Sequence, residues 1–309
     1  MAEIQHLGLV ISTGHRNWAI GELAKNLLPA FTKSSIIEIP QSRRHIRSLN
    51  GFMFWPKKSR YLFMHHSLAV KAWERKWIGE STQYGIRYTH DSINVEETLD
   101  VFSNAKFITT ENSVSKLQLA RKGLDDKRIH VLPHPIEVNR FRVGMNEKNR
   151  DVIFVSNFYE RKNPELVLNV LKYCQDLKFT ILGKNWEKWS KFSELKALKN
   201  FEYQLFSYEN YPKMLARHKV FCSLSTLEGG PVPLIESLAS GLKIVVTDTG
   251  HVRDVLSQIH DYNIIPIDAK VDVVVSALRE AIADCSISDQ SFEKFDLKFY
   301  VETLHALFN

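Results

Sequence analysis

The sequence predicts an α/β protein with two doubly wound, Rossmann-like domains, and three observations support this prediction. Short apolar runs that end in polar or glycine-containing turns alternate with helical patterns of about 10 to 15 residues, which is typical of βαβ units and a mostly parallel sheet. This alternation stops once near the middle of the chain and then restarts. The length of 309 residues is enough for about two domains.

In the first half, the alternation gives a domain of five strand patterns. Two prolines and a polar, charged segment follow it in residues 128–150, so we place the first domain at residues 1–145. The strand patterns lie at residues 6–12, 34–40, 60–67, 85–92 and 105–113, and the helical patterns at 18–31, 68–78, 95–104 and 114–123.

In the second half, the same alternation predicts a domain at residues 146–290. Ligands of such open sheets bind outside the carboxyl ends of the strands, so the loops that follow the strands are the places to look for a site. The strand patterns lie at 151–157, 178–183, 201–206, 220–226, 243–248 and 264–267, and the helical patterns at 163–175, 210–219, 232–241, 251–258, 270–285 and 295–309.

Composition favours an ordinary cytoplasmic protein. Hydrophobic residues make up 44% and charged residues 25% of the chain, as in globular proteins. Cys174, Cys222 and Cys285 are odd in number and lack CxxC spacing, which argues against a disulfide framework and a structural zinc site. The start of the sequence has no signal-peptide pattern, and no apolar run approaches the ~18 residues of a membrane span. We therefore expect neither secretion by a classical signal nor a membrane-spanning segment.

Charge is distributed unevenly between the two halves. Residues 1–150 hold 23 Lys and Arg against 14 Asp and Glu, whereas residues 151–309 hold 18 against 21. Residues 41–60 contain six Lys or Arg, no acid, and three aromatic residues. Such a segment suits an anionic membrane surface, a nucleic acid backbone or an acidic substrate, and a solvated loop is the structural alternative.

The stretch STLEGGPVPLIESLASG, residues 225–241, joins a strand pattern to a helical pattern. Glu228 follows the strand, and the adjacent Gly229 and Gly230 allow a ligand to approach the backbone closely. Proline is suited to the first helical turn, and the N–H groups there form an anion site with the helix dipole. Glu236 is expected at about the first turn. The two carboxylates can therefore meet two hydroxylated groups of one ligand, or they merely complement the helix dipole.

Several ordered segments of the chain resemble the family 4 (group 1) retaining glycosyltransferases of the GT-B fold. EGGPVPLIESLASGLKIVVTDTGHVRDVL, residues 228–256, is similar to the E-x7-E signature, whose usual form is EGFGLPLLEAMACGTPVVATDVGG. Residues 101–141 resemble the end of the family's first domain, and residues 153–185 resemble the opening of its nucleotide domain. The resemblance implies two Rossmann-like domains facing across a cleft, with a terminal helix, residues 291–309, packing back on the first.

The resemblance also implies roles for the residues of a donor site. Glu236 would hold the ribose hydroxyls of a nucleotide-sugar donor, and Glu228 would bind and orient the donor hexose. Lys162 stands where the family has a lysine that neutralises the leaving diphosphate, although a lysine can also be merely solvated. Asn157 replaces a family arginine, and the adjacent Arg161 is the candidate to compensate. The diphosphate cradle would be formed by the backbone of Gly229, Gly230, Pro231, Val232 and Leu234.

In the first domain, the resemblance points to loops that follow three strands. Gly14 matches the family's glycine-rich turn, where Arg16 would add a charge, although this loop has a single glycine. YTHDS resembles a family strand end, which makes His90 the residue beside the anomeric centre and Asp91 its neighbour on the acceptor side. His65, with His66 beside it, is a further acceptor-site candidate, and an isolated histidine can also be structural.

The implied reaction transfers a hexose from a nucleotide-diphosphate sugar to a glycan or lipid-linked acceptor, such as a lipopolysaccharide, with retained configuration. His90, Glu228 and Lys162 would be the catalytic residues, and neither a metal ion nor a cofactor is expected, since no HExxH or DxD spacing occurs. Residues Arg43 to Arg60 would dock on the anionic inner face of a membrane. The alternatives are a sugar-nucleotide epimerase or hydrolase and a non-catalytic binding protein. A nucleic acid partner is not expected, because no recognised binding motif accompanies the basic charge.

Overall fold

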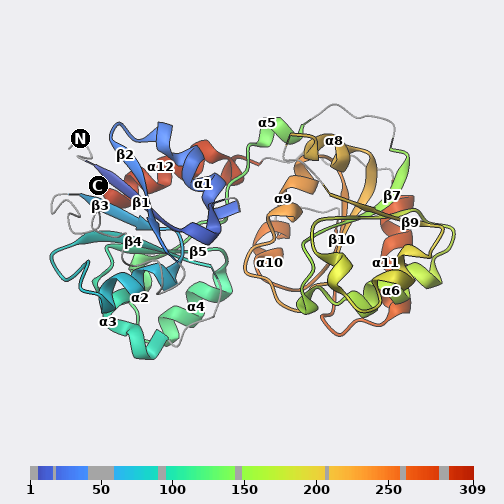
Figure 1. Ribbon diagram of the computed structural model, residues 1–309, viewed down its shortest axis with the longest axis horizontal. Coiled ribbons are helices and arrows are strands. Elements are labelled where there is room, and N and C mark those ends of the chain that lie inside the picture. Colours follow the sequence, from blue (N-terminus) through green and yellow to red (C-terminus); the bar gives the residue numbers. More distant parts are fainter. Residues whose placement is uncertain are drawn as a thin grey trace. The chain divides into compact units, whose positions relative to one another are not determined.

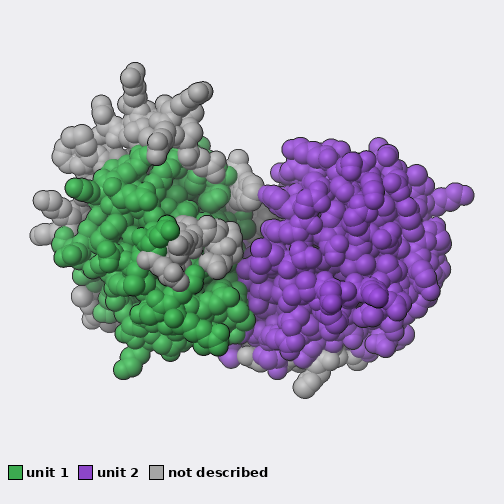
Figure 2. Space-filling model, turned by 90° about the horizontal axis from the view of Figure 1, so that it is seen from below, with its two compact units in different colours: residues 1–135, 297–309 green, residues 136–296 purple. Residues whose placement is uncertain are grey.

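The computed structural model divides the chain into two compact units, which are coloured separately in Figure 2. Unit 1 comprises Met1–Pro135 and Leu297–Asn309, and unit 2 comprises Ile136–Asp296. Each unit holds one six-stranded parallel sheet with helices packed on it, so the predicted α/β fold class is confirmed for both units (Figure 1). The structure describes residues 6–16, 19–40, 59–89, 95–142, 148–205, 209–257, 262–284 and 292–309.

The sheet of unit 1 has the strand order β2-β1-β3-β4-β5-β6, and every neighbouring pair is parallel. Its central strands are buried on both faces, as all six residues of β1 show, and this is the pattern expected for a sheet covered by helices on each side. The strands are β1 (Leu7–Ser12), β2 (Ser34–Ile39), β3 (Arg60–Phe63), β4 (Gln83–Tyr88), β5 (Phe107–Thr110) and β6 (Ile129–Val131), and the helices are α1 (Ala19–Leu27), α2 (His66–Glu74), α3 (Leu99–Asn104), α4 (Ser113–Arg121) and α12 (Leu297–Phe308).

The last helix, α12, completes the core of unit 1. Tyr300, Leu304 and Phe308 are buried in one cluster with residues of β1 and α1. The ring of Phe308 meets that of Phe107 edge to face, with the centroids 4.8 Å apart. In Figure 1, α12 (red) accordingly lies beside the blue N-terminal elements.

The sheet of unit 2 has the strand order β12-β11-β10-β7-β8-β9, again entirely parallel. The strands are β7 (Arg150–Val155), β8 (Phe179–Leu182), β9 (Phe201–Gln204), β10 (His218–Ser223), β11 (Lys243–Thr247) and β12 (Tyr262–Ile265). The helices are α5 (Val138–Phe141), α6 (Pro164–Tyr173), α7 (Phe192–Lys196), α8 (Tyr211–Ala216), α9 (Val232–Ala239), α10 (Val252–Leu256) and α11 (Val271–Ala283).

The chain leaves unit 1 at Pro135, ten residues before the boundary that we placed at residue 145. Ile136, Val138 and Phe141 are buried in the core of unit 2, so this short apolar segment belongs to the second unit. The backbone N–H of Ile136 also donates to the carbonyl of Phe295, 2.8 Å away, where the chain is about to return. The boundary therefore follows apolar packing, whereas the polar residues after it suggested the later position.

The cysteines that the structure describes form no disulfide. Cys174 and Cys222 are free, buried thiols, and Cys285 lies outside the described residues.

Among the helices that the structure describes, none combines the length and the apolar character that crossing a lipid bilayer requires.

Candidate functional site

The candidate site lies where two neighbouring strands of unit 2 end. Because β7 and β10 are adjacent and parallel, the loops that follow them emerge at the same edge of the sheet. The two loops are hydrogen-bonded to each other: the N–H of Thr226 donates to the carbonyl of Arg161, and the Arg161 guanidinium donates to the carbonyl of Leu227, both over 2.8 Å. Residues 160–163 and 225–230 are therefore held together by one main-chain hydrogen bond and one hydrogen bond from a side chain.

Glu228 forms ion pairs with two cations of the opposite loop. Lys162 donates a short hydrogen bond to Glu228 Oε1, and Arg161 Nη1 lies 2.8 Å from Glu228 Oε2. The carboxylate side chain is 8% exposed and that of Lys162 is 15% exposed, whereas that of Arg161 is 40% exposed. Two positive groups thus face one buried negative group, which leaves a local excess of positive charge.

The electrostatics of this cluster favour the charged forms of the pair. Burial acts to raise the pKa of Glu228, but the attraction of Lys162 and Arg161 outweighs it and holds the pKa below its ordinary value. Burial lowers the pKa of Lys162, and Glu228 opposes that shift. Each partner therefore supports the charge of the other at neutral pH.

A third loop, between β11 and α10, lies against the backbone of Glu228. Gly250, between β11 and α10, has a φ of +58°, a conformation that side chains other than glycine rarely adopt. A Cβ atom at this position would lie 2.8 Å from the carbonyl oxygen of Glu228 and 2.7 Å from that of Gly229. Glycine is therefore required here both for the turn and for the close approach.

Glu236 lies on the same polypeptide stretch but in a different environment. It is the fifth residue of α9, in the second turn instead of the first, and it is buried. Tyr211 Oη donates a hydrogen bond to Glu236 Oε2 over 2.8 Å. Burial raises the pKa of Glu236 to about 7, against the opposing effects of Tyr211 and Arg140. The two glutamates of the motif therefore differ: Glu228 is stabilised as an anion, and Glu236 titrates near neutrality.

The start of α9 offers fewer free amides than its sequence suggests. Pro231 is the N-cap residue and has no N–H group, and the Leu234 amide donates to the Pro231 carbonyl over 2.9 Å. Leu234 is thereby used within the first turn of the helix. Among the amides predicted to cradle a diphosphate, those of Gly230 and Val232 remain the best placed at the helix N-terminus.

Comparison with known protein families identifies the family to which the chain belongs. The family model for "Glycosyl transferases group 1" matches residues 135–294, which is more than half of the chain and nearly all of unit 2. The chain belongs to the group 1 glycosyltransferases.

Solved structures show that this glycosyltransferase has the GT-B fold. Anabaena HepE in complex with UDP and glucose has a TM-score of 0.73 at 9% identity, covering 97% of this chain and 98% of that one. The lipopolysaccharide outer core galactosyltransferase WaaB gives 0.70 at 13%, covering 98% of both chains. Sucrose-phosphate synthase from Thermosynechococcus elongatus gives 0.71 at 13%, covering 99% and 95%. Among curated proteins, no sequence matches this chain.

In this glycosyltransferase, the Asn157 side chain connects two loops of unit 2. Its Oδ1 accepts a hydrogen bond from the backbone N–H of Lys184 over 2.9 Å, which ties the loop after β7 to the loop after β8. Arg161 instead lies beside Glu228, with its guanidinium 5.3 Å from the ring centroid of Tyr159. The cations that pair with Glu228 therefore come from positions 161 and 162.

In unit 1, the predicted residues lie at the ends of β1 and β3. The Gly14 amide donates to Ser12 Oγ over 3.3 Å, and Arg16 forms a two-pronged ion pair with Glu38 over 2.7 and 2.8 Å. Among the described residues, no group of three or more His, Cys, Asp or Glu is arranged to hold a metal ion. The histidine rings after β1 and β3 lie close together, with centroids 5.7 Å apart for His15 and His65 and 4.3 Å apart for His65 and His66.

Three of the sequence predictions fall wholly or mostly outside the described residues. They concern His90, its neighbour Asp91, and the basic segment from Arg43 to Arg60, of which only Ser59 and Arg60 are described. Their roles stay predictions.

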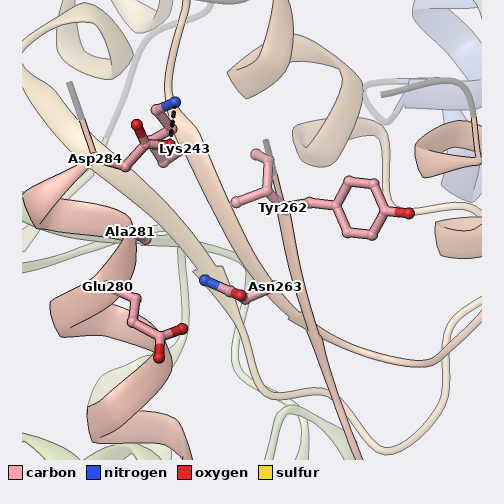
Figure 3. Close-up of a pocket in the computed structure, with 7 residues that line it drawn as sticks. Lys243, Tyr262, Asn263, Glu280, Ala281 and Asp284 are labelled. Carbon is pink, nitrogen blue, oxygen red and sulfur yellow. Dashed lines mark hydrogen bonds and ion pairs between the residues drawn. The ribbon is translucent and has the colours of Figure 1, made fainter. Parts of the chain in front are cut away.

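A small pocket of unit 2 lies away from this site (Figure 3). It has a volume of about 210 Å³ and includes Lys243 at the start of β11, whereas Glu228 follows the end of the parallel strand β10. The pocket is therefore at the opposite edge of the sheet. Lys243 is paired there with Asp284 over 2.7 Å, and the other lining residues are Ile244, Tyr262, Asn263, Glu280 and Ala281.

Two residues of the site were not singled out from the sequence. Gly250 falls inside the family-like segment, and its position after a strand was the available signal. Tyr211 lies 25 residues before Glu236 on another helix, and no motif links the two. Contacts of this kind arise only when α8 and α9 pack together.

Proposed function

We propose that this glycosyltransferase transfers a hexose from a nucleotide-diphosphate sugar to a glycan or lipid-linked acceptor and retains the anomeric configuration, as family 4 enzymes do. The cluster of Lys162, Arg161 and Glu228 at the N-terminus of α9 carries the proposal. It combines excess positive charge, helix-terminal amides and a fixed carboxylate, which suit a diphosphate joined to a polyol.

Donor binding would use the motif along its length. The diphosphate would meet Lys162 and the amides of Gly230 and Val232, and Glu228 would accept hydrogen bonds from the hexose hydroxyls. Glu236 would accept hydrogen bonds from the ribose hydroxyls, since an ionised carboxylate accepts two donors readily. The ion pairs of Glu228 place its carboxylate in one orientation before the donor arrives.

Chemistry would depend on the charge that develops as the glycosyl phosphate bond breaks. Negative charge grows on the leaving diphosphate, and preorganised positive groups stabilise it more in the transition state than in the ground state. Lys162 and Arg161 would provide these charges, so we propose a metal-independent reaction. For retention, the acceptor would attack from the face of the leaving group, and a phosphate oxygen would take the acceptor proton. His90 would lie beside the anomeric carbon, and Asp91 would orient the acceptor.

Similar structures and the basic segment suggest the first substrates to test. The HepE structures contain UDP, UDP with glucose, or UDP-glucose, and WaaB is a galactosyltransferase, which supports UDP-hexoses as the first donors. The segment from Arg43 to Arg60 would bind an anionic membrane on the cytoplasmic face, where a lipid-linked acceptor is presented. Co-sedimentation with anionic and neutral vesicles tests this point; equal binding to both, or binding to neither, refutes it.

A thermal-shift screen with UDP-, GDP- and ADP-sugars tests the donor class. We expect one nucleotide series to raise the melting temperature and the Glu236→Ala variant to lose that rise. The selected donor is then incubated with and without a panel of glycan and lipid-linked acceptors. Transfer with retained configuration supports the proposal, whereas turnover to an epimer without acceptor would favour an epimerase. Donor binding without transfer to any acceptor would favour a binding protein.

A further inference from the structure

Tyr211 and Glu236 form a buried hydrogen bond between two helices. Tyr211 Oη lies 2.8 Å from Glu236 Oε2, and the two residues are 3% and 8% exposed. A phenol that donates to a carboxylate in such a place fixes the orientation of the carboxyl group and occupies one lone pair of one oxygen. The other carboxylate oxygen of Glu236 would then be available to a ligand of the site.

The tyrosine ring is itself held by packing. It meets the ring of Phe141 edge to face, with the centroids 5.7 Å apart and the planes at 81°. Phe141 ends α5, and α5, α8 and α9 contact one another in pairs around this core. Tyr211 therefore has little freedom to turn away from Glu236.

The charged and titratable groups around Glu236 are few among the described residues. Tyr211 acts on it from α8, and Arg140 acts on it from α5 through its positive charge. On the sheet side, β11 contributes the apolar residues Ile244 and Val246 to the same cluster. Lys243 of β11 is paired with Asp284 at the far edge of the sheet.

We propose that Tyr211 is a positioning residue that orients Glu236 for the ribose of the donor and thereby sets the pH at which the nucleotide binds. The proposal rests on the proposed function, because it concerns the carboxylate assigned there to the ribose. The hydroxyl of Tyr211 stabilises the ionised, acceptor-only form of Glu236, which is the form that can accept from both ribose hydroxyls.

Loss of the hydroxyl has a defined consequence for titration. Burial raises the pKa of Glu236 to about 7 even though the hydrogen bond from Tyr211 acts to lower it. A Tyr211→Phe variant would therefore keep Glu236 protonated to a higher pH. Nucleotide affinity, which rises as Glu236 ionises, would reach its midpoint at a higher pH in the variant.

The experiment measures dissociation constants by calorimetry from about pH 5.5 to about pH 8.5. The probes are the tightest binder among UDP, GDP and ADP and its 2′-deoxy counterpart. We expect the wild type to bind the ribonucleotide more tightly than its 2′-deoxy counterpart. In Tyr211→Phe, the ratio of the two dissociation constants should shrink about tenfold, or by ~1.4 kcal/mol. The matched control is Tyr203→Phe, because Tyr203 also donates to a glutamate, Glu187, over 2.9 Å, but at an exposed position. The control should behave as the wild type does.

The outcomes separate the two proposals. A wild type that binds none of the three nucleotides refutes the proposed function itself. If the wild type binds but Tyr211→Phe keeps both its ribose preference and its midpoint pH, the positioning role alone is overturned. A wild type that binds without ribose preference overturns the positioning role together with the assignment of Glu236 to the ribose. Phe141→Leu, which loosens Tyr211 without touching Glu236, provides a second variant should Tyr211→Phe fail to fold. It should move the midpoint in the same direction by less, and an unchanged midpoint counts against the proposal.

Discussion

Lys162 donates a hydrogen bond to Glu228 across the two loops that follow β7 and β10. This bond connects the residue proposed to neutralise a leaving diphosphate with the residue proposed to hold the sugar. When a diphosphate binds, Lys162 has to serve both anions, while Arg161 continues to neutralise Glu228 from the other side. The cluster is therefore built to accept an additional negative charge without isolating the buried carboxylate.

Removal of the lysine charge tests this arrangement. We expect Lys162→Gln to reduce kcat by about 10²- to 10³-fold, because positive charge at the leaving group acts mainly on the transition state. Steady-state kinetics with the donor selected in the thermal-shift screen measure it. Lys172→Gln, which removes the lysine of an exposed ion pair with Glu194, is the control and should leave kcat unchanged. A similar loss in both variants would contradict a specific role for Lys162.

Gly250→Ala tests the close approach behind Glu228. The added Cβ would be strained by the positive φ and would press on the carbonyl oxygens of residues 228 and 229. Gly241→Ala is matched, since its φ is +71° but nothing lies within 4 Å of the added atom. Urea unfolding should show a loss of about 1 kcal/mol for Gly241→Ala and at least ~2 kcal/mol for Gly250→Ala, together with weaker donor binding in the latter alone. Equal losses would show that the contact with the loop is unimportant.

Glu236 makes stability depend on pH with a defined sign. Its pKa in the folded protein, about 7, lies above the ordinary value of 4.5, so the unfolded state releases this proton first as the pH rises. The contribution of Glu236 to stability is therefore present at or below about pH 4.5 and is lost as the pH rises to about 7. The shift corresponds to about 3 kcal/mol.

The measurement is the free energy of unfolding across that range for the wild type and for Glu236→Gln, both without ligand. We expect the variant to gain stability relative to the wild type as the pH rises, because its amide does not ionise. Other groups, such as His218 and His251, whose pKa values burial lowers to about 4, contribute equally to both proteins and cancel. A pH-independent difference between the two proteins would disprove the assignment.

The ion pair of Arg87 and Glu111 tests how unit 1 depends on a buried charge. Both side chains are under 5% exposed, and Glu111 Oε2 also accepts the backbone N–H of His134 over 3.0 Å. Glu111→Ala would leave the guanidinium buried without its counter-ion, so we expect a loss of about 3 to 5 kcal/mol in urea unfolding. Asp176→Ala breaks the exposed pair with Arg279 and should cost less than about 1 kcal/mol. Comparable small losses in both would indicate that water reaches Arg87.

Local pattern predicted much of this architecture, and long-range packing explains what it missed. Apolar runs located the strands on which the site depends, and the E-x7-E segment located Glu228 and Glu236. Strand β6 was missed, because it has three residues, of which only Ile129 is buried, and prolines follow it closely. The bond from Tyr211 to Glu236 and the use of Asn157 as a brace between loops depend on helices and strands meeting in space. Such contacts cannot be predicted from the spacing of residues in the sequence.

The position of α12 determines when unit 1 can complete its folding during translation. An N-terminal domain usually folds as soon as it leaves the ribosome, since its core is encoded upstream. Here the core around Leu7 and Leu9 also contains Tyr300, Leu304 and Phe308, so it is completed only by residues that are translated after unit 2. The unit that is synthesised first is therefore the one that has to wait, with part of its apolar surface uncovered, until the whole of the second unit has been made.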